Sequence, residues 1–263
     1  MHRSEHDPWL IGQRQPAARL RLICFSHAGG HPGAYLAWQA ALGPQVEVRA
    51  VQLPGRGMRF HERGHRSFEP LRAELGAVLS RCADLPCALF GHSLGALLAF
   101  EVARAATARG QAPLHLFVSG CAAPRQRGSR RPLHRLDDDE LCRELGRYGG
   151  TPPEVLADRE LMRLLLPVLR DDFALVDDYR RAPGPALSMP LTVLAGRDDA
   201  EVPSDSVSAW AEEAGAGCEL QWFDGGHFFI DSARPAVTDL LRWRLAPLLE
   251  RGARTPSASM TAA

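Results

Sequence analysis

One serine of this chain lies between two glycines, in the stretch Gly91-His92-Ser93-Leu94-Gly95. An apolar run typical of a buried strand, Cys87–Phe90, precedes it, and a segment rich in alanine and leucine, Leu94–Ala108, follows it. G-x-S-x-G between a strand and a helix is the pattern of a nucleophile elbow, a turn too sharp for side chains at both flanking positions. The motif therefore predicts a strained serine above a helix N-terminus, where negative charge is favoured.

The alternative interpretation is that Ser93 is an ordinary helix N-cap between two turn glycines. The five-residue pattern alone is a weak signal, because glycine and serine are common. Both glycine positions and both flanking segments fit the elbow, so we favour a nucleophile.

Elsewhere, short apolar runs alternate with segments that look helical. This alternation predicts an α/β fold with a mostly parallel central sheet and helices on both faces. A chain of 263 residues suits one such domain. The expected strands are 20–25, 46–53, 87–90, 114–119, 191–195 and 220–223, and the expected helices are 67–82, 94–108, 137–148, 207–214 and 237–249.

A stretch of about 70 residues without a clear strand separates Ser119 from Leu191. It is too long for an ordinary crossover and reads as an arginine-rich loop followed by helices. We expect a helical lid over about residues 122–185, within a single domain spanning residues 1–252. Gly149-Gly150 is either a hinge of this lid or a helix terminator. The polar tail, residues 253–263, is expected to be disordered.

A serine nucleophile requires a base. In folds with this elbow, the order along the chain is Ser, then Asp or Glu, then His. Of the histidines after Ser93, His115 falls in an expected strand and His134 in the arginine-rich loop. His227 directly follows the last strand, after two glycines that allow the loop to direct its imidazole. We assign His227 as the base, in preference to an ordinary turn histidine.

Two adjacent carboxylates, Asp198 and Asp199, follow the strand that precedes His227. This is where the fold places the acid that fixes the histidine tautomer and stabilises the imidazolium. The acid commonly follows the pattern G-x-x-D-x-x-V, which here is Gly196, Asp199 and Val202. The spacing selects Asp199, and Asp198 is interpreted as a turn residue.

An oxyanion hole requires two backbone N–H groups. The residue after the nucleophile, Leu94, supplies one, and we assign the other to Ala28 in F-S-H-A-G-G, a glycine-rich loop after an early strand. Ser26 and His27 in this loop look like a catalytic pair. They are adjacent in sequence, so their side chains diverge on an extended backbone, and we interpret both as structural.

Taken together, these motifs resemble the α/β-hydrolase fold and, more narrowly, the stand-alone type II thioesterases of polyketide and nonribosomal peptide synthases. The resemblance covers most of the chain, and the combination of H-A-G-G, P-G-R-G and G-G-H-F-F is more specific than G-H-S-L-G alone. It implies a Ser-His-Asp hydrolase that removes aberrant or stalled acyl chains from the phosphopantetheine arm of acyl or peptidyl carrier proteins. It implies no cofactor beyond that arm, which belongs to the substrate.

Composition limits the other partners. The 31 basic and 31 acidic residues balance, which gives no electrostatic reason to bind nucleic acid or an anionic membrane. No lysine is present, which excludes a Walker-type phosphate loop. The N-terminus lacks the apolar core of a signal peptide, no run approaches a membrane span, and the six scattered cysteines indicate reduced thiols. We expect a cytoplasmic monomer.

Five arginines lie within residues 124–135, among them Arg130 and Arg131. Carrier proteins of such systems are usually acidic, so this segment is a candidate docking patch. The alternative is an ordinary solvated loop.

Other functions are alternatives to the thioesterase hypothesis. Another serine hydrolase of the same fold, a carboxylesterase or an acyltransferase, remains open, as does a non-catalytic binding domain. His61, Glu62 and His65 match the zinc-protease pattern H-E-x-x-H, but a glycine lies inside the motif and the surroundings are loop-like, whereas the chemistry needs a helix. We interpret that match as chance and expect no metal.

Overall fold

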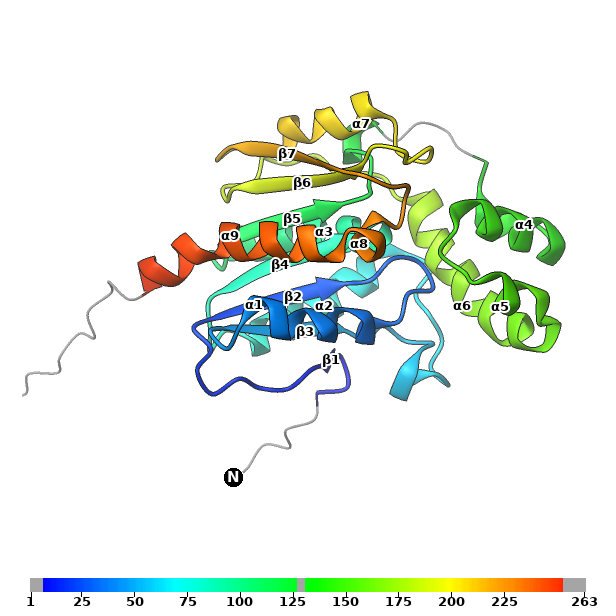
Figure 1. The fold of residues 1–263 in the computed structure, drawn as a ribbon, viewed down its shortest axis with the longest axis horizontal. Coiled ribbons are helices and arrows are strands. Elements are labelled where there is room, and N and C mark those ends of the chain that lie inside the picture. The colour runs from blue at the N-terminus through cyan, green and yellow to red at the C-terminus, as the bar shows by residue number, and fades with distance from the viewer. Residues whose placement is uncertain (1–6, 127–130, 253–263) are drawn as a thin grey trace, which may run out of the picture.

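A computed structural model describes residues 7–126 and 131–252. In this part of the chain, seven strands form one sheet in the order β1-β3-β2-β4-β5-β6-β7 (Figure 1). All neighbouring strands are parallel except the edge pair β1 and β3, which confirms the predicted mostly parallel sheet. The strands are β1 (Leu10–Ile11), β2 (Leu20–Phe25), β3 (Val46–Val51), β4 (Cys87–His92), β5 (His115–Ser119), β6 (Leu191–Gly196) and β7 (Cys218–Phe223).

Helices cover both faces of the sheet, as expected for parallel strands that are buried on both sides. On one face, α2 (Phe68–Arg81) and α3 (Leu94–Ala108) pack in a core with side chains such as Ile23 of β2. On the other, α1 (Trp38–Leu42) and α9 (Arg234–Gly252) pack in a second core (Figure 1).

The segment predicted as a helix over 207–214 is instead split into a short α7 (Ser204–Ser208) and a 3₁₀ turn (Ala209–Glu213). The fully buried Trp210 donates its indole N–H to the Cys121 carbonyl at 2.8 Å, so a tertiary contact fixes this segment. Two short α-helical segments escape the sequence analysis because they give too little periodicity: α1 and α8 (Phe229–Ser232).

Three α-helices of the described residues lie between β5 and β6, beyond the carboxyl ends of the strands (Figure 1). They are α4 (Asp138–Tyr148), α5 (Pro153–Ala157) and α6 (Arg159–Asp178). Their apolar faces, including Leu141, Leu166 and Phe173, form a third core separate from the two that flank the sheet. The helical lid is therefore an element with its own packing, held over the end of the sheet where the elbow lies.

Two of the sequence expectations concern residues outside the described part of the chain, the tail 253–263 and Arg130. None of the six cysteines, all of which are described, forms a disulfide bond. Among the described residues, no helix is long and apolar enough to cross a membrane.

Candidate active site

Ser93 joins β4 to α3 in a strained turn. Its φ of 56° makes it the one non-glycine residue of the described chain with positive φ. A Cβ on Gly91 would lie 2.0 Å from the Gly95 carbonyl oxygen, and one on Gly95 would lie 2.0 Å from that of Phe25. Glycine is therefore required on both sides of the serine. The Ser93 side chain makes no capping hydrogen bond to α3, contrary to the N-cap interpretation.

A histidine and a carboxylate face each other beside this turn. His227 Nδ1 lies 2.8 Å from Asp199 Oδ2, and the side chains are 6% and 1% exposed, respectively. The other oxygen of Asp199 accepts a hydrogen bond from the Glu201 N–H at 2.9 Å. With Nδ1 donating to Asp199, the imidazole presents Nε2 as the acceptor that a general base needs.

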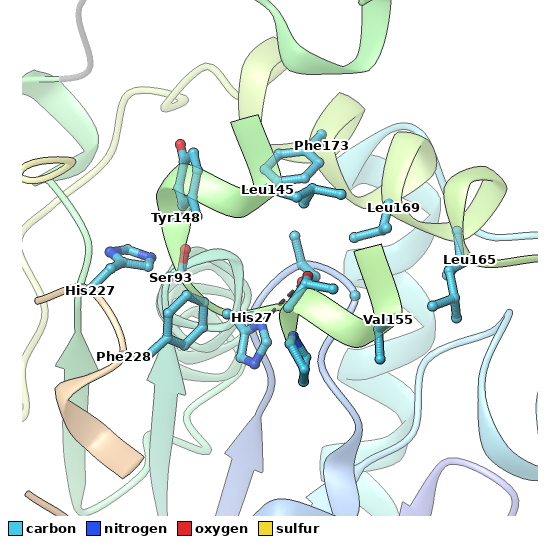
Figure 2. Close-up of a pocket in the computed structure, with 16 residues that line it drawn as sticks. His27, Ser93, Leu145, Tyr148, Val155, Leu165, Leu169, Phe173, His227 and Phe228 are labelled. Atoms are coloured by element: carbon cyan, nitrogen blue, oxygen red, sulfur yellow. Dashed lines mark hydrogen bonds between the residues drawn. The ribbon is translucent and has the colours of Figure 1, made fainter. Parts of the chain in front are cut away.

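The strand order brings the three residues together. Ser93, Asp199 and His227 follow β4, β6 and β7, whose carboxyl ends lie along the same edge of the sheet. Ser93 and His227 line the same two cavities. Figure 2 shows the imidazole of His227 directed toward the Ser93 hydroxyl.

The other acidic and basic candidates lie elsewhere. Asp198 is exposed, and its backbone N–H donates to the Gly225 carbonyl at 3.0 Å. His115 begins β5, at the opposite end of the sheet from the elbow, and its Nε2 lies 2.8 Å from the Thr192 hydroxyl. His134 pairs with Asp177 of α6 at 2.8 Å.

Rings hold His227 in place. The ring centroids of His92 and Phe228 each lie 5.1 Å from that of His227, and Tyr148 of α4 meets it edge-on at 5.5 Å. Burial lowers the pKa of His92 well below the usual range, with His227 as a second cause. His92 is therefore neutral near pH 7 and supports its neighbour without adding a charge.

The two residues assigned to the oxyanion hole, Ala28 and Leu94, each line a cavity that Ser93 also lines. Leu94 is the first residue of α3, so its N–H has no acceptor within the helix. Ala28 lies in the loop after β2 and lines one of the cavities that contain Ser93. In that loop, His27 Nδ1 lies 3.0 Å from the Ala28 carbonyl oxygen, and the Gly29 N–H donates to Asp172 of α6 at 2.7 Å.

Two cavities meet at Ser93 and His227. One, of about 200 Å³, extends under the lid and is lined mainly by apolar side chains, among them Val155, Leu165 and Leu169 (Figure 2). The other, of about 550 Å³, carries charged side chains of both signs, including Arg180 and Asp205. Ser93 thus lies between a mainly apolar cavity and a larger one whose lining mixes polar and apolar side chains. We call them the apolar chamber and the polar channel.

The residues that match the zinc-protease pattern are not part of this site. His61, Glu62 and His65 lie in a loop rather than on a helix, where Glu62 pairs with Arg59 and His65 faces Glu74 at 3.5 Å. The described residues contain no cluster of His, Cys, Asp and Glu that could hold a metal ion. Arg131 is 63% exposed and contacts Glu140 at 2.8 Å.

Two lid residues that reach the site, Tyr148 and Asp172, belong to no motif that the sequence shows. Tyr148 lines both cavities, and Asp172 binds the loop that contains Ala28. Gly149 ends α4 in the left-handed conformation, as a helix terminator does. A Cβ on Gly150 would lie 2.1 Å from the Phe228 ring, so this glycine allows the lid to approach the site.

The chain is similar to several known proteins. A family model described as "Thioesterase domain" matches residues 20–244. The gramicidin S biosynthesis protein GrsT of Aneurinibacillus migulanus is 33% identical over 250 residues, which cover 93% of this chain and 98% of GrsT. Thioesterase PikA5 of Streptomyces venezuelae is 37% identical over 218 residues, which cover 82% of this chain and 77% of PikA5. The structure of the type II thioesterase BorB from the borrelidin biosynthetic cluster is similar with a TM-score of 0.85 and 38% identity, covering 92% of this chain and all of that one.

Proposed function

Because the chain belongs to the thioesterase family, we propose that it hydrolyses acyl thioesters on the phosphopantetheine arm of acyl or peptidyl carrier proteins. In this role it removes aberrant or stalled chains during polyketide or nonribosomal peptide synthesis. The observation that carries the proposal is the placement of Ser93 and His227 where the apolar chamber meets the polar channel. The names of GrsT and BorB, which refer to biosynthesis of gramicidin S and borrelidin, support the same setting.

Acylation begins at the elbow. His227 Nε2 takes the Ser93 proton as the oxygen attacks the thioester carbonyl, and Asp199 stabilises the resulting imidazolium. The carbonyl oxygen gains negative charge, which the Ala28 and Leu94 N–H groups stabilise. The carbon–sulfur bond then breaks, the proton on His227 passes to the sulfur, and the holo-carrier leaves with a free thiol.

Deacylation repeats these steps with water. His227 takes a proton from a water molecule as its oxygen attacks the acyl-serine ester, and the same two amides stabilise the second tetrahedral intermediate. The carbon–oxygen bond to Ser93 breaks, the serine regains its proton from His227, and the free acid leaves. This proposed cycle uses no metal and no cofactor held by the enzyme.

The two cavities divide the substrate. The apolar chamber takes the acyl group, whereas the polar channel takes the amide-rich arm. A volume of about 200 Å³ suits a short or medium acyl chain, since an apolar protein cavity of roughly 150 Å³ accommodates a benzene molecule.

The carrier protein is the proposed partner, and Arg130 and Arg131 remain the proposed docking residues. Arg131 lines the polar channel, where an acidic carrier delivering its arm would approach. Its side chain is largely exposed despite the contact with Glu140.

A comparison of leaving groups tests the proposed substrate class. Wild type should hydrolyse a carrier-bound hexanoyl thioester with a kcat/KM at least about 100-fold above that of a small hexanoyl oxygen ester, because only the carrier substrate fills the channel. A preference for the oxygen ester would favour a carboxylesterase. Transfer of the acyl group to an alcohol or amine in place of water would favour an acyltransferase.

A further inference from the structure

The lid helix α6 reaches the oxyanion loop, residues 26–30, through one buried carboxylate. Asp172 Oδ2 accepts the Gly29 N–H at 2.7 Å, and both carboxylate oxygens accept from Arg56 Nη2 at 2.8 Å. The side chains of Arg56 and Asp172 are only 7% and 3% exposed. We propose that Asp172, held by Arg56, is a positioning residue that sets the oxyanion loop for catalysis. The proposal rests on the function proposed above.

The contacts fix one peptide unit at both of its polar groups. The unit between Ala28 and Gly29 has its carbonyl oxygen 3.0 Å from His27 Nδ1 and its N–H bound to Asp172. The Ala28 N–H lies in the preceding peptide unit, which is joined to this one through the φ and ψ angles of Ala28. Fixing this unit therefore restricts the directions that the Ala28 N–H can take. An oxyanion donor is effective only when it is already directed at the developing charge.

Gly29 packs closely against α6, which leaves no space there for a side chain. Its φ is 71°, in the left-handed region, and a Cβ there would lie 2.5 Å from a methyl group of Leu169 on α6. Arg56 also donates to the Gly30 carbonyl at 3.3 Å. Three segments thus meet at the carboxylate: the oxyanion loop, the P-G-R-G loop after β3, and the lid.

The position of α6 is therefore coupled to the oxyanion hole. A lid displacement that carries Asp172 away removes the acceptor of the Gly29 N–H and the partner of the buried Arg56 cation. Loss of one oxyanion donor typically costs about 10²–10³-fold in kcat. Because the lid also forms the acyl chamber, the hole is complete only when the chamber is closed.

The test distinguishes the role of the Asp172 side chain as a hydrogen-bond acceptor from the role of its negative charge. Asp172→Asn and Asp172→Ala both remove the negative charge, but only asparagine retains an oxygen for the Gly29 N–H. Each is made alone and together with Arg56→Met, so that in the second pair no unpaired buried cation is left to unfold the protein. Glu101→Gln is the control. Glu101 also forms a buried ion pair, with Arg104 at 3.0 Å, but this pair does not contact the oxyanion loop.

Two rates are measured for every variant. One is kcat and KM for a hexanoyl thioester of N-acetylcysteamine, and the other is the rate constant for Ser93 labelling by an alkyl fluorophosphonate. Complete labelling also gives the folded, active fraction. We expect Asp172→Ala to lie at least tenfold below Asp172→Asn in kcat and in labelling rate, in both backgrounds, with KM within about twofold. Glu101→Gln should lower thermal stability but retain the wild-type rate per active molecule.

Equal kcat values and labelling rates for the Ala and Asn variants in the Arg56→Met background would overturn the positioning role. The positioning role would also be overturned if the Asp172 variants only contained fewer active molecules, with wild-type rates per active molecule. If the wild type is labelled at Ser93 but cleaves no thioester, the proposed function fails, and the labelling rates alone still decide the role of Asp172.

Discussion

Asp199 and His227 form a hydrogen-bonded pair, Oδ2 to Nδ1 at 2.8 Å, although they lie 28 residues apart in the chain. The neighbouring Asp198 projects into solvent from the same turn. The position of the carboxylate within the turn after β6 therefore decides, to a single residue, which aspartate can orient the imidazole.

Asp199→Asn should lower kcat by on the order of 10³–10⁴-fold, because the amide favours the wrong imidazole tautomer and no longer stabilises the imidazolium. Asp198→Asn is the matched control and should stay within about threefold of wild type. Steady-state hydrolysis of a small thioester checks both. The reverse ranking would move the acid to Asp198.

Val155→Phe should shorten the acyl chain that the enzyme accepts, since Val155 of α5 lines the apolar chamber. We expect kcat/KM for an octanoyl thioester to fall at least tenfold, whereas the acetyl value stays within about twofold. Leu164→Phe adds a ring to an exposed position of α6 outside the chamber. It should leave the ratio of the octanoyl to the acetyl kcat/KM unchanged. An equal loss for both chain lengths would argue against an acyl chamber at this position.

His115 should make the fold less stable in acid. Burial, with a further contribution from Arg244, lowers its pKa to about 4 from 6.5. The unfolded chain therefore binds a proton more readily between these values, and the free energy of unfolding falls as pH falls below about 6.5. From pH 7.5 to 5.0 this group should cost about 2 kcal/mol. Urea unfolding at both pH values should show a weaker pH dependence for His115→Gln, and an unchanged dependence would contradict the assignment.

Charge reversal of Arg130 and Arg131 to glutamate should raise KM for an acyl-carrier protein while turnover of a small thioester stays the same. The reason is that only the carrier presents an acidic surface. Glu140→Gln breaks the contact of Arg131 without adding negative charge, and it should not weaken carrier turnover. Equal effects of the reversal on both substrates would remove the docking role.

Local patterns in the sequence suffice for the six parallel strands of the sheet and for the candidate triad. The parallel strands are short runs that are apolar or alternate apolar with polar residues. The two glycines around Ser93 follow from sterics that act within a few residues. The spacing from Gly196 to Val202 selects the carboxylate that faces His227. In each case the constraint lies within one short segment of the chain.

Contacts between distant segments could not be predicted in this way. Asp172 is an acidic residue of a lid helix. Nothing nearby in the sequence indicates that it binds Gly29, which lies 143 residues away. Tyr148 contacts His227 only because α4 folds back over the end of the sheet. The edge strand β1 has two residues, too few for a periodic signal.

The most direct test of the central claim measures the release of acyl groups from a panel of acyl-carrier proteins by wild type and by Ser93→Ala. Intact-protein mass spectrometry monitors the conversion of each carrier protein. Wild type should convert acyl-carrier to holo-carrier with a free thiol, and Ser93→Ala should be slower by a factor of about 10³ or more. A Ser93→Ala protein that releases the acyl group at the wild-type rate would contradict the account.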